Sequence, residues 1–323
     1  MANKTNMTNK KKMKIFAVGC CLATVVAAVL VWSLMKCEDK KVQVTTGTLE
    51  VYPDFPSKYV EPRMVSVWLP EGYQKGEACD VLYMHDGQML FDAETSWNHQ
   101  EWMVDEVADS MMNQSVIRRC IVVGIDNTKR RLSELFPTKT CQYVNVNGHQ
   151  GSEVKSKMLG DEYLRFMVEE VKPFIEEHYQ PLQGPDHTFV MGSSMGGLIS
   201  LYALCEYPQL FGGAACLSTH ISMAHLPFLD TDVWGSTDVW AEAFRSYLRE
   251  HLPAANSRKV YMDRGTEDLD AEYATDQTLA DKMFREIGWD NEHYSSEVFR
   301  GHSHCERDWA KRLNKPLIFL LKR

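Results

Sequence analysis

The chain has 323 residues, 44% of them hydrophobic and 24% charged, so it can form one large or two small globular domains, and this composition argues against a largely disordered protein. Its formal net charge is −9, although residues 1–36 carry six lysines and no acidic residue. The remainder is therefore more acidic still, which argues against a nucleic-acid partner, because phosphate backbones are bound by basic surfaces. The nine cysteines form no C-x-x-C pair, and we expect most of them to be small buried hydrophobic residues.

The N-terminus has the features of an export signal or a membrane anchor. The basic stretch 10–14 precedes an uncharged, mostly apolar run of twenty-one residues, Ile15 to Met35, which is long enough to span a bilayer as a helix. Its length favours an uncleaved anchor, although small residues within it leave cleavage open. The basic flank puts the following residues outside the cytoplasm. We therefore expect residues 1–41 to form a signal or anchor segment and residues 42–323 to form a single extracytoplasmic domain, secreted or held at the membrane.

Two alternatives remain for this apolar run. It could be a buried helix of a soluble domain, or the signal of a bacterial lipoprotein with the lipid on Cys20 or Cys37. Neither cysteine fits the lipoprotein pattern well. The apolar stretch ahead of Cys20 is too short, and Cys37 follows Lys36 where a small residue is expected.

Beyond residue 42, apolar runs rich in β-branched residues alternate with amphipathic segments. The expected strands are 64–69, 81–85, 120–125, 188–191, 214–217, 259–262 and 296–299. Residues 161–179 have apolar side chains at helical spacing, and a second helix is expected over 195–207. Strands that alternate with helices predict a mostly parallel sheet, and continuous apolar strands predict helices on both of its faces. The long polar stretch 127–159 is a candidate wall or lid of a binding site.

The segment Gly192-Ser193-Ser194-Met195-Gly196-Gly197 joins an expected strand to an expected helix. In this setting a G-x-S-x-G pattern is typical of a serine nucleophile, because the sharp turn exposes the serine and the glycines leave room for the strand and helix to cross. The free N–H groups at the start of the helix can stabilise a developing oxyanion, with the N–H of Met195 as the obvious donor. Ser194 is the expected nucleophile. Ser193 competes with it but has glycines at the wrong offsets.

A serine nucleophile requires a histidine base that is oriented by a carboxylate. In α/β-hydrolases these residues follow in the order serine, acid, histidine. The last expected strand leads into a segment with His302 and His304, and the strand before it leads into the acidic loop 263–270. The residues by themselves leave open which member of each segment acts. As an alternative, His302 and His304 could ligate a metal together with a nearby carboxylate.

The chain resembles an esterase family of α/β-hydrolases that includes esterase D-like, feruloyl, acetyl-xylan and enterochelin esterases. The resemblance covers about residues 60–320 and is carried by segments 81–92, 121–127, 192–197, 265–268 and 301–309. It implies the α/β-hydrolase fold, with a mostly parallel central sheet and helices on both faces.

The resemblance also implies particular site residues. The family patterns G-T-x-D and G-x-x-H-x-x-x-x-W favour Asp268 as the acid and His304 as the base. They disfavour the neighbouring candidates Glu267, Asp270 and His302. The second oxyanion donor of the family maps to the backbone N–H of Gln88, and His85 would be a structural residue near the site.

These residues together predict a serine carboxylic-ester hydrolase that needs no metal or organic cofactor. The expected substrate is a small ester or an esterified polysaccharide carrying acetyl or feruloyl groups. An enterochelin-type siderophore ester is the alternative substrate, and a non-catalytic binding protein on the same fold is the alternative from another class. The aromatic residues Trp97, Trp102 and those of 228–240 either line a substrate pocket or pack in the core.

Overall fold

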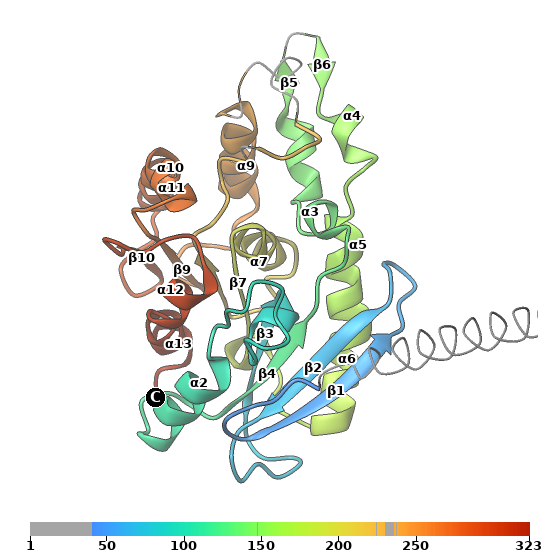
Figure 1. Cartoon of the computed structure of the whole chain (residues 1–323). Coiled ribbons are helices and arrows are strands. Elements are labelled where there is room, and N and C mark those ends of the chain that lie inside the picture. The colour runs from blue at the N-terminus through green and yellow to red at the C-terminus, as the bar shows by residue number, and fades with distance from the viewer. Residues whose placement is uncertain (1–40, 147, 224, 230–235, 237) are drawn as a thin grey trace, which may run out of the picture. The chain divides into compact units, whose positions relative to one another are not determined.

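The computed structural model describes residues 41–323 except 147, 224, 230–235 and 237. Residues 1–40 of the predicted signal or anchor segment 1–41 therefore lie outside the described residues. Within the described part of the chain, no helix combines the length and the apolar character that crossing a bilayer requires. Residues Val42–Arg323 form one compact unit (Figure 1).

An eight-stranded sheet forms the centre of the described unit. Its strands are β1 (Thr48–Phe55), β2 (Arg63–Leu69), β3 (Asp80–His85), β4 (Cys120–Ile125), β7 (Thr188–Ser193), β8 (Gly213–Leu217), β9 (Lys259–Arg264) and β10 (Tyr294–Val298). Their order across the sheet is β1-β2-β4-β3-β7-β8-β9-β10. Strand β2 is antiparallel to both of its neighbours, and every neighbouring pair from β4 to β10 is parallel. The predicted mostly parallel α/β architecture is confirmed.

The structure contains one strand of the main sheet that the sequence analysis did not predict. Strand β1 lies at the edge of the sheet, and Phe55 is its only buried residue. It is held by antiparallel backbone pairing with β2, from Thr48 opposite Leu69 onward. An edge strand with solvent on most of its side chains has no continuous apolar run, so hydrophobicity could not reveal it.

Helices connect the strands and cover the sheet. The 3₁₀ and π segments are η1 (Gly87–Met89), η2 (Thr138–Tyr143), η3 (Phe166–Val171) and η4 (Pro185–His187). The α-helices are α2 (Val104–Asn113), α3 (Arg131–Glu134), α4 (Ser152–Lys155), α5 (Gly160–Arg165), α6 (Lys172–Tyr179), α7 (Met195–Glu206), α9 (Asp238–His251), α10 (Leu269–Glu272), α11 (Ala274–Glu286), α12 (Glu306–Ala310) and α13 (Asn314–Leu321). The expected helix 161–179 is present as α5, a π-helical turn and α6 in succession. A short two-stranded ribbon, β5 (Asn145–Val146) with β6 (His149–Gln150), lies in the long polar stretch.

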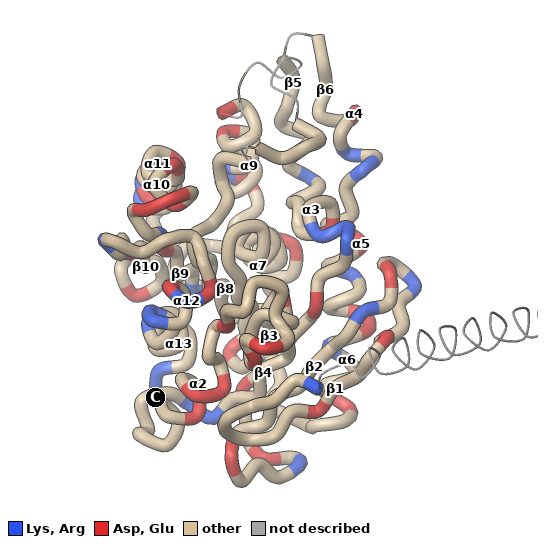
Figure 2. Tube along the Cα trace, viewed as in Figure 1, with Lys and Arg blue, Asp and Glu red and all other residues tan. Residues whose placement is uncertain are grey.

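Successive residues of the central strands point to opposite faces, so each strand contributes to two apolar layers. In β3, Val81 and Tyr83 belong to the layer that includes residues of α5, α6, α7, α9 and α11. Leu82 and Met84 belong to the layer that includes residues of α2 and α13. Charged residues of both signs lie mainly on helices and loops of this unit, whereas β4 and β8 contain none (Figure 2). Helices therefore pack on both faces of the sheet, as the sequence predicted.

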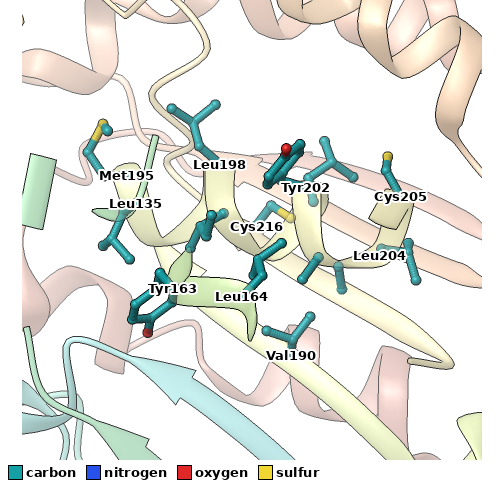
Figure 3. Packing of buried hydrophobic residues seen from close by; sticks show 14 of the residues in the cluster. Leu135, Tyr163, Leu164, Val190, Met195, Leu198, Tyr202, Leu204, Cys205 and Cys216 are labelled. Atoms are coloured by element: carbon teal, nitrogen blue, oxygen red, sulfur yellow. The ribbon is translucent and has the colours of Figure 1, made fainter. Parts of the chain in front are cut away.

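Helix α7 is the best-buried helix of the described unit. Every residue of it except the last, Glu206, is buried, and a helix that is apolar all round belongs in a core. Figure 3 shows Leu198 and Tyr202 projecting from α7 on one side and Leu204 on another, with Val190 and Cys216 of the sheet nearby. Burial of each such large side chain contributes about 1.5–3 kcal/mol. The packing fixes the position of the helix start, where the predicted nucleophile lies.

The described cysteines are all free. Five of them are buried, as expected of small hydrophobic residues, and Cys305 is partly exposed.

Candidate active site

The turns that follow β3, β7, β9 and β10 lie at one edge of the sheet, because the carboxyl ends of parallel strands meet there. Ligands bind at this edge in open α/β sheets. A cavity of about 450 Å³ opens at it and is lined by Gln88 after β3, Ser194 after β7 and His304 after β10, among other residues. Three predicted site residues from distant parts of the chain therefore border one cavity.

Ser194 occupies a strained turn between β7 and α7. Its φ of 56° and ψ of −120° are unusual for a residue with a side chain, and such conformations cost about 1–3 kcal/mol each. Backbone hydrogen bonds hold the turn on both sides: Ser194 N–H donates to Leu217 O at 2.9 Å, and His220 N–H donates to Ser194 O at 3.3 Å. A Cβ at Gly192 would lie 2.7 Å from the carbonyl carbon of Gly196. The glycine of the motif is thus required by the close approach of strand and helix.

The expected oxyanion donors lie at the starts of two helical segments. Met195 is the first residue of α7, where N–H groups have no acceptor within the helix. Gln88 lies in η1, directly after β3, and its side-chain Oε1 accepts the N–H of Asn127 at 3.1 Å. A Cβ at Gly87 would lie 2.8 Å from Ile125 N, so only glycine lets this loop lie against β4.

His304 is hydrogen-bonded to Asp270, with 2.6 Å between Nδ1 and Oδ1. The Asp270 side chain is fully buried and that of His304 is 14% exposed. The prediction that Asp268 accompanies His304 is wrong for this structure: Asp268 is exposed and precedes α10. The N–H of Gly265 donates to Asp270 Oδ2 at 2.5 Å and folds the loop back, so the first turn of α10 points Asp270 inward.

The surroundings of Asp270 favour its charged form. Burial by itself raises the pKa of this carboxyl, but hydrogen bonds from His304, Ser218 and the Gly265 N–H outweigh it and lower the pKa below its usual range. An ionised Asp270 that accepts a proton-bearing Nδ1 leaves Nε2 of His304 as the free basic nitrogen. The pair therefore has the electronic arrangement of a general base with its orienting carboxylate.

Two residues that the sequence analysis missed lie on another side of Ser194. The hydroxyl of Tyr273 is hydrogen-bonded to the Ser194 side chain and lies 2.5 Å from Nδ1 of His220. The Tyr273 ring also packs edge-on against His304, with 5.6 Å between ring centroids. The Ser194 hydroxyl is hydrogen-bonded to Tyr273, and over the described residues it is not hydrogen-bonded to His304. The hydrogen bond between a nucleophile and its base is often long without substrate and shortens when substrate binds. No sequence motif surrounds Tyr273 or His220, so only the tertiary fold reveals them.

A partly buried ion pair forms another part of the cavity wall. The guanidinium of Arg131 binds both carboxylate oxygens of Asp86, at 2.6 and 2.7 Å, and Asn127 Nδ2 donates to the same carboxylate at 2.6 Å. Burial raises the pKa of Asp86, but the Arg131 charge prevails and lowers it. The polar stretch that begins at Asn127 thus supplies part of the wall, as predicted for the long loop.

The neighbouring His85 is buried, as expected of a structural residue. Its Nδ1 lies 2.7 Å from the Tyr163 hydroxyl. Burial lowers the pKa of His85 to about 4, so it is neutral at neutral pH.

The aromatic candidates divide between pocket and core. Trp97 is 76% exposed, and it lines the cavity together with Trp102. Trp309 lines it as well and lies 5.3 Å from Trp102, centroid to centroid. Trp240, in contrast, is fully buried, and its ring packs edge-on against Phe136. One wall of the cavity is therefore aromatic, with an exposed tryptophan at its mouth.

The two histidines of the C-terminal loop have different surroundings. His304 contacts Asp270, whereas Nδ1 of His302 lies 3.3 Å from both the Asp308 carbonyl oxygen and Arg312 Nη1. Over the described residues, no group of three His, Cys, Asp or Glu side chains is arranged to hold a metal ion.

The fold and the arrangement of the strand-end turns are those of an α/β-hydrolase-like protein. The family model described as "Putative esterase" matches residues 57–320, and the chain belongs to that family. The uncharacterized protein YbbA of Bacillus subtilis is 26% identical over 157 residues, which are 48% of this chain and 56% of that protein. The siderophore enterobactin esterase of Emericella nidulans is 29% identical over 153 residues, 45% of this chain and 47% of that protein.

A CE1 ferulic acid esterase of Anaeromyces mucronatus, solved in complex with ferulic acid, is similar in fold. Its TM-score is 0.56 at 17% identity, over 87% of this chain and 93% of that structure. The chain spans less than two thirds of the length of the curated relatives that it matches.

Proposed function

We propose that the protein is a serine carboxylic-ester hydrolase in which Ser194 is the nucleophile, His304 the base and Asp270 the carboxylate that orients the base. The observation that carries this proposal is the 2.6 Å contact between His304 and the buried Asp270, at a cavity that Ser194 also lines. Membership of the esterase family supports the reaction class. Asp270 replaces Asp268 in the mechanism predicted from the sequence.

The chemistry proceeds in two steps. His304 Nε2 takes the proton of Ser194 while Oγ attacks the ester carbonyl carbon, and the N–H groups of Met195 and Gln88 donate to the oxyanion. The protonated His304 then gives its proton to the departing alcohol oxygen. In the second step His304 deprotonates a water molecule that attacks the acyl-enzyme, and the proton returns to Oγ as the carboxylic acid leaves.

As substrates we propose acetyl or feruloyl esters of polysaccharide. The exposed Trp97 at the mouth and the buried Trp102 and Trp309 behind it suit an aromatic acyl group or a sugar ring. The fold similarity to a ferulic acid esterase agrees with this choice. The basic and apolar N-terminal segment supports a place of action outside the cytoplasm, where such polymers occur.

A siderophore ester is the second candidate substrate. It is favoured by the 29% identity to a siderophore enterobactin esterase over about half of each chain. Hydrolysis rates of the full-length protein on acetylated xylan, a feruloylated oligosaccharide and a catecholate siderophore ester, compared as kcat/KM, distinguish the two. A preference of tenfold or more for the siderophore ester would replace the polysaccharide assignment.

The reaction class is tested by Ser194→Ala. We expect this change to reduce hydrolysis of a simple aryl acetate by roughly 10⁴-fold or more and to abolish labelling by a fluorophosphonate probe, which requires an activated serine. The neighbouring Ser193→Ala serves as the matched control, because Ser193 borders the same cavity. Full activity of Ser194→Ala, or absence of both activity and labelling in the unaltered protein, would contradict the proposal, and the latter would favour a binding protein.

A further inference from the structure

A buried arginine lies behind the proposed acid, and the mechanism above does not use it. Arg312 stands between α12 and α13, and its side chain is 1% exposed. Its Nε and Nη2 donate to the two carboxylate oxygens of Asp263 at 3.2 and 3.0 Å. The Asp263 side chain, on β9, is fully buried. The paired charges are thus both removed from solvent.

This ion pair is connected to Asp270 through Ser218. Arg312 Nη2 donates to Ser218 Oγ at 2.8 Å, and Ser218 Oγ donates to Asp270 Oδ2 at 2.6 Å. Trp309 Nε1 also donates to Ser218 Oγ, at 2.9 Å. Oδ1 of Asp270 contacts His304 while Oδ2 contacts Ser218. A continuous polar chain therefore runs from Asp263 to the proposed base.

The charge balance of this chain is uneven. Two fully buried carboxylates face one buried guanidinium, which lies 3.6 Å from Asp270 Oδ2 and closer to Asp263. Burial raises the pKa of the Asp263 carboxyl, and the charge and hydrogen bonds of Arg312 oppose that shift. In such a low-dielectric setting charges a few ångströms apart interact strongly and are little screened by salt. A change of charge at Arg312 or Asp263 will therefore change the electrostatic potential at His304.

We propose that Arg312 is a positioning residue for the His304–Asp270 pair: it holds Asp270 through Ser218 and sets the electric field at His304, with Asp263 as its counter-charge. The inference rests on the proposed function. It assigns a role to Arg312, Asp263 and Ser218, none of which touches the cavity.

Other titratable groups surround this chain. They are Tyr261 on β9, Glu297 on β10, His302 in the loop, Glu272 on α10, Tyr273, Asp308 on α12, and Lys311 and Lys315 beyond it. Asp308 pairs with Lys311 at 2.6 Å and Glu297 with Lys315 at 3.6 Å. Both lysine side chains are about half exposed, so solvent screens these pairs more than the buried ones.

The test is the acid limb of the pH profile of kcat/KM for an aryl acetate, which reports the pKa of the base in the free enzyme. Arg312→Met removes a positive charge, so the protonated form of His304 is favoured and the limb moves to higher pH. Asp263→Asn removes a negative charge and moves the limb to lower pH. We expect shifts of about one pH unit in opposite directions. In the double variant, which removes both charges, the acid limb should lie close to its position in the unaltered protein.

Arg312→Lys keeps the charge and should leave the acid limb within about 0.3 pH units of its position in the unaltered protein. A purely structural role predicts lower activity with an unmoved limb in both single variants, and that result, or shifts in the same direction, would overturn the inference. If the charge variants do not fold, Ser218→Ala decides the question, because it breaks the connection without altering charge. We expect kcat to fall about tenfold with little change in KM, and an unchanged kcat would overturn the inference.

Failure of this inference is separable from failure of the proposed function. Loss of activity in Ser194→Ala establishes the serine mechanism whatever the outcome at Arg312. Retained activity in Ser194→Ala would remove the basis for both.

Discussion

The turn after β7 and the turn after β9 have nearly the same backbone and present their side chains differently. Ser194 has φ 56° and ψ −120°, and Asp268 has φ 50° and ψ −135°; each directly precedes a helix. In the first turn the strained residue itself borders the cavity. In the second the strained residue is exposed, and the buried carboxylate follows two positions later at Asp270. The strained residue itself is therefore the proposed catalytic residue of the first turn, whereas in the second turn the proposed residue lies two positions beyond it and contacts His304.

The largest expected difference between the two turns is in activity. Asp270→Asn should lower kcat/KM for an aryl acetate by roughly 10⁴-fold, because an amide cannot hold His304 in the required tautomer or stabilise its protonated form. Asp268→Asn should change it by less than about twofold, since the side chain is exposed. The reverse result, with activity lost at Asp268 and kept at Asp270, would restore the acid predicted from the family pattern.

The glycines of the two turns offer the next comparison. An added Cβ at Gly192 would lie 2.7 Å from the Gly196 carbonyl carbon, and one at Gly265 would collide with the carbonyl oxygen of His302. Each alanine variant should destabilise the protein by about 1–3 kcal/mol in urea unfolding. Activity should fall by roughly 100-fold in both, because displacements of about 1 Å have that effect at catalytic groups. Unchanged stability and activity at either position would show that the backbone there can shift without cost.

A smaller loss of kcat is expected when Tyr273, which contacts the Ser194 side chain, is changed. Tyr273→Phe removes the hydroxyl that contacts the Ser194 side chain and keeps the ring against His304, so we expect kcat to fall about tenfold with KM nearly constant. Tyr163→Phe is the matched control, because its buried hydroxyl also bonds a histidine Nδ1, that of His85. Tyr163→Phe should lower the free energy of unfolding by about as much as Tyr273→Phe does, and should leave kcat within about twofold of the unaltered protein. Equal losses of kcat in both variants would indicate a general packing effect.

The smallest effect is on stability. Glycine adopts the conformations of Ser194 and Asp268 without strain, so Ser194→Gly and Asp268→Gly should each raise the free energy of unfolding by up to about 1 kcal/mol. Only Ser194→Gly should abolish activity. Thermal or urea unfolding, measured beside the aryl acetate assay, checks both points, and destabilisation at both sites would argue against strain in these turns.

The sequence predicted those features that depend on local pattern. Continuous apolar runs located the central strands, and G-x-S-x-G placed Ser194, because the motif reflects a backbone constraint within six residues. The place after the last strand predicted a segment with His302 and His304, and the family pattern then selected His304. The family pattern favoured Asp268 as the partner of His304, whereas the structure buries Asp270 and hydrogen-bonds it to His304, Ser218 and the Gly265 N–H. Two aspartates in one acidic loop look alike in the sequence, and these contacts arise only in the fold.

Contacts between distant parts of the chain could not be read from the sequence. The Tyr273–His220 pair joins residues 53 positions apart, and Ser218 meets Arg312 across 94 positions. Neither pair lies within a recognisable motif. Such networks depend on which polar groups the fold buries together, which hydrophobic pattern alone does not specify.

Cys305 follows the proposed base, is partly exposed and borders the cavity, whereas the other described cysteines are buried. An alkylating reagent such as iodoacetamide would therefore attach beside His304 and obstruct substrate entry although the proposed nucleophile is a serine. Inhibition by thiol reagents would then be a misleading sign of a cysteine hydrolase, and Cys305→Ser should remove it. The same thiol offers an attachment point for a fluorescent reporter of ligand entry.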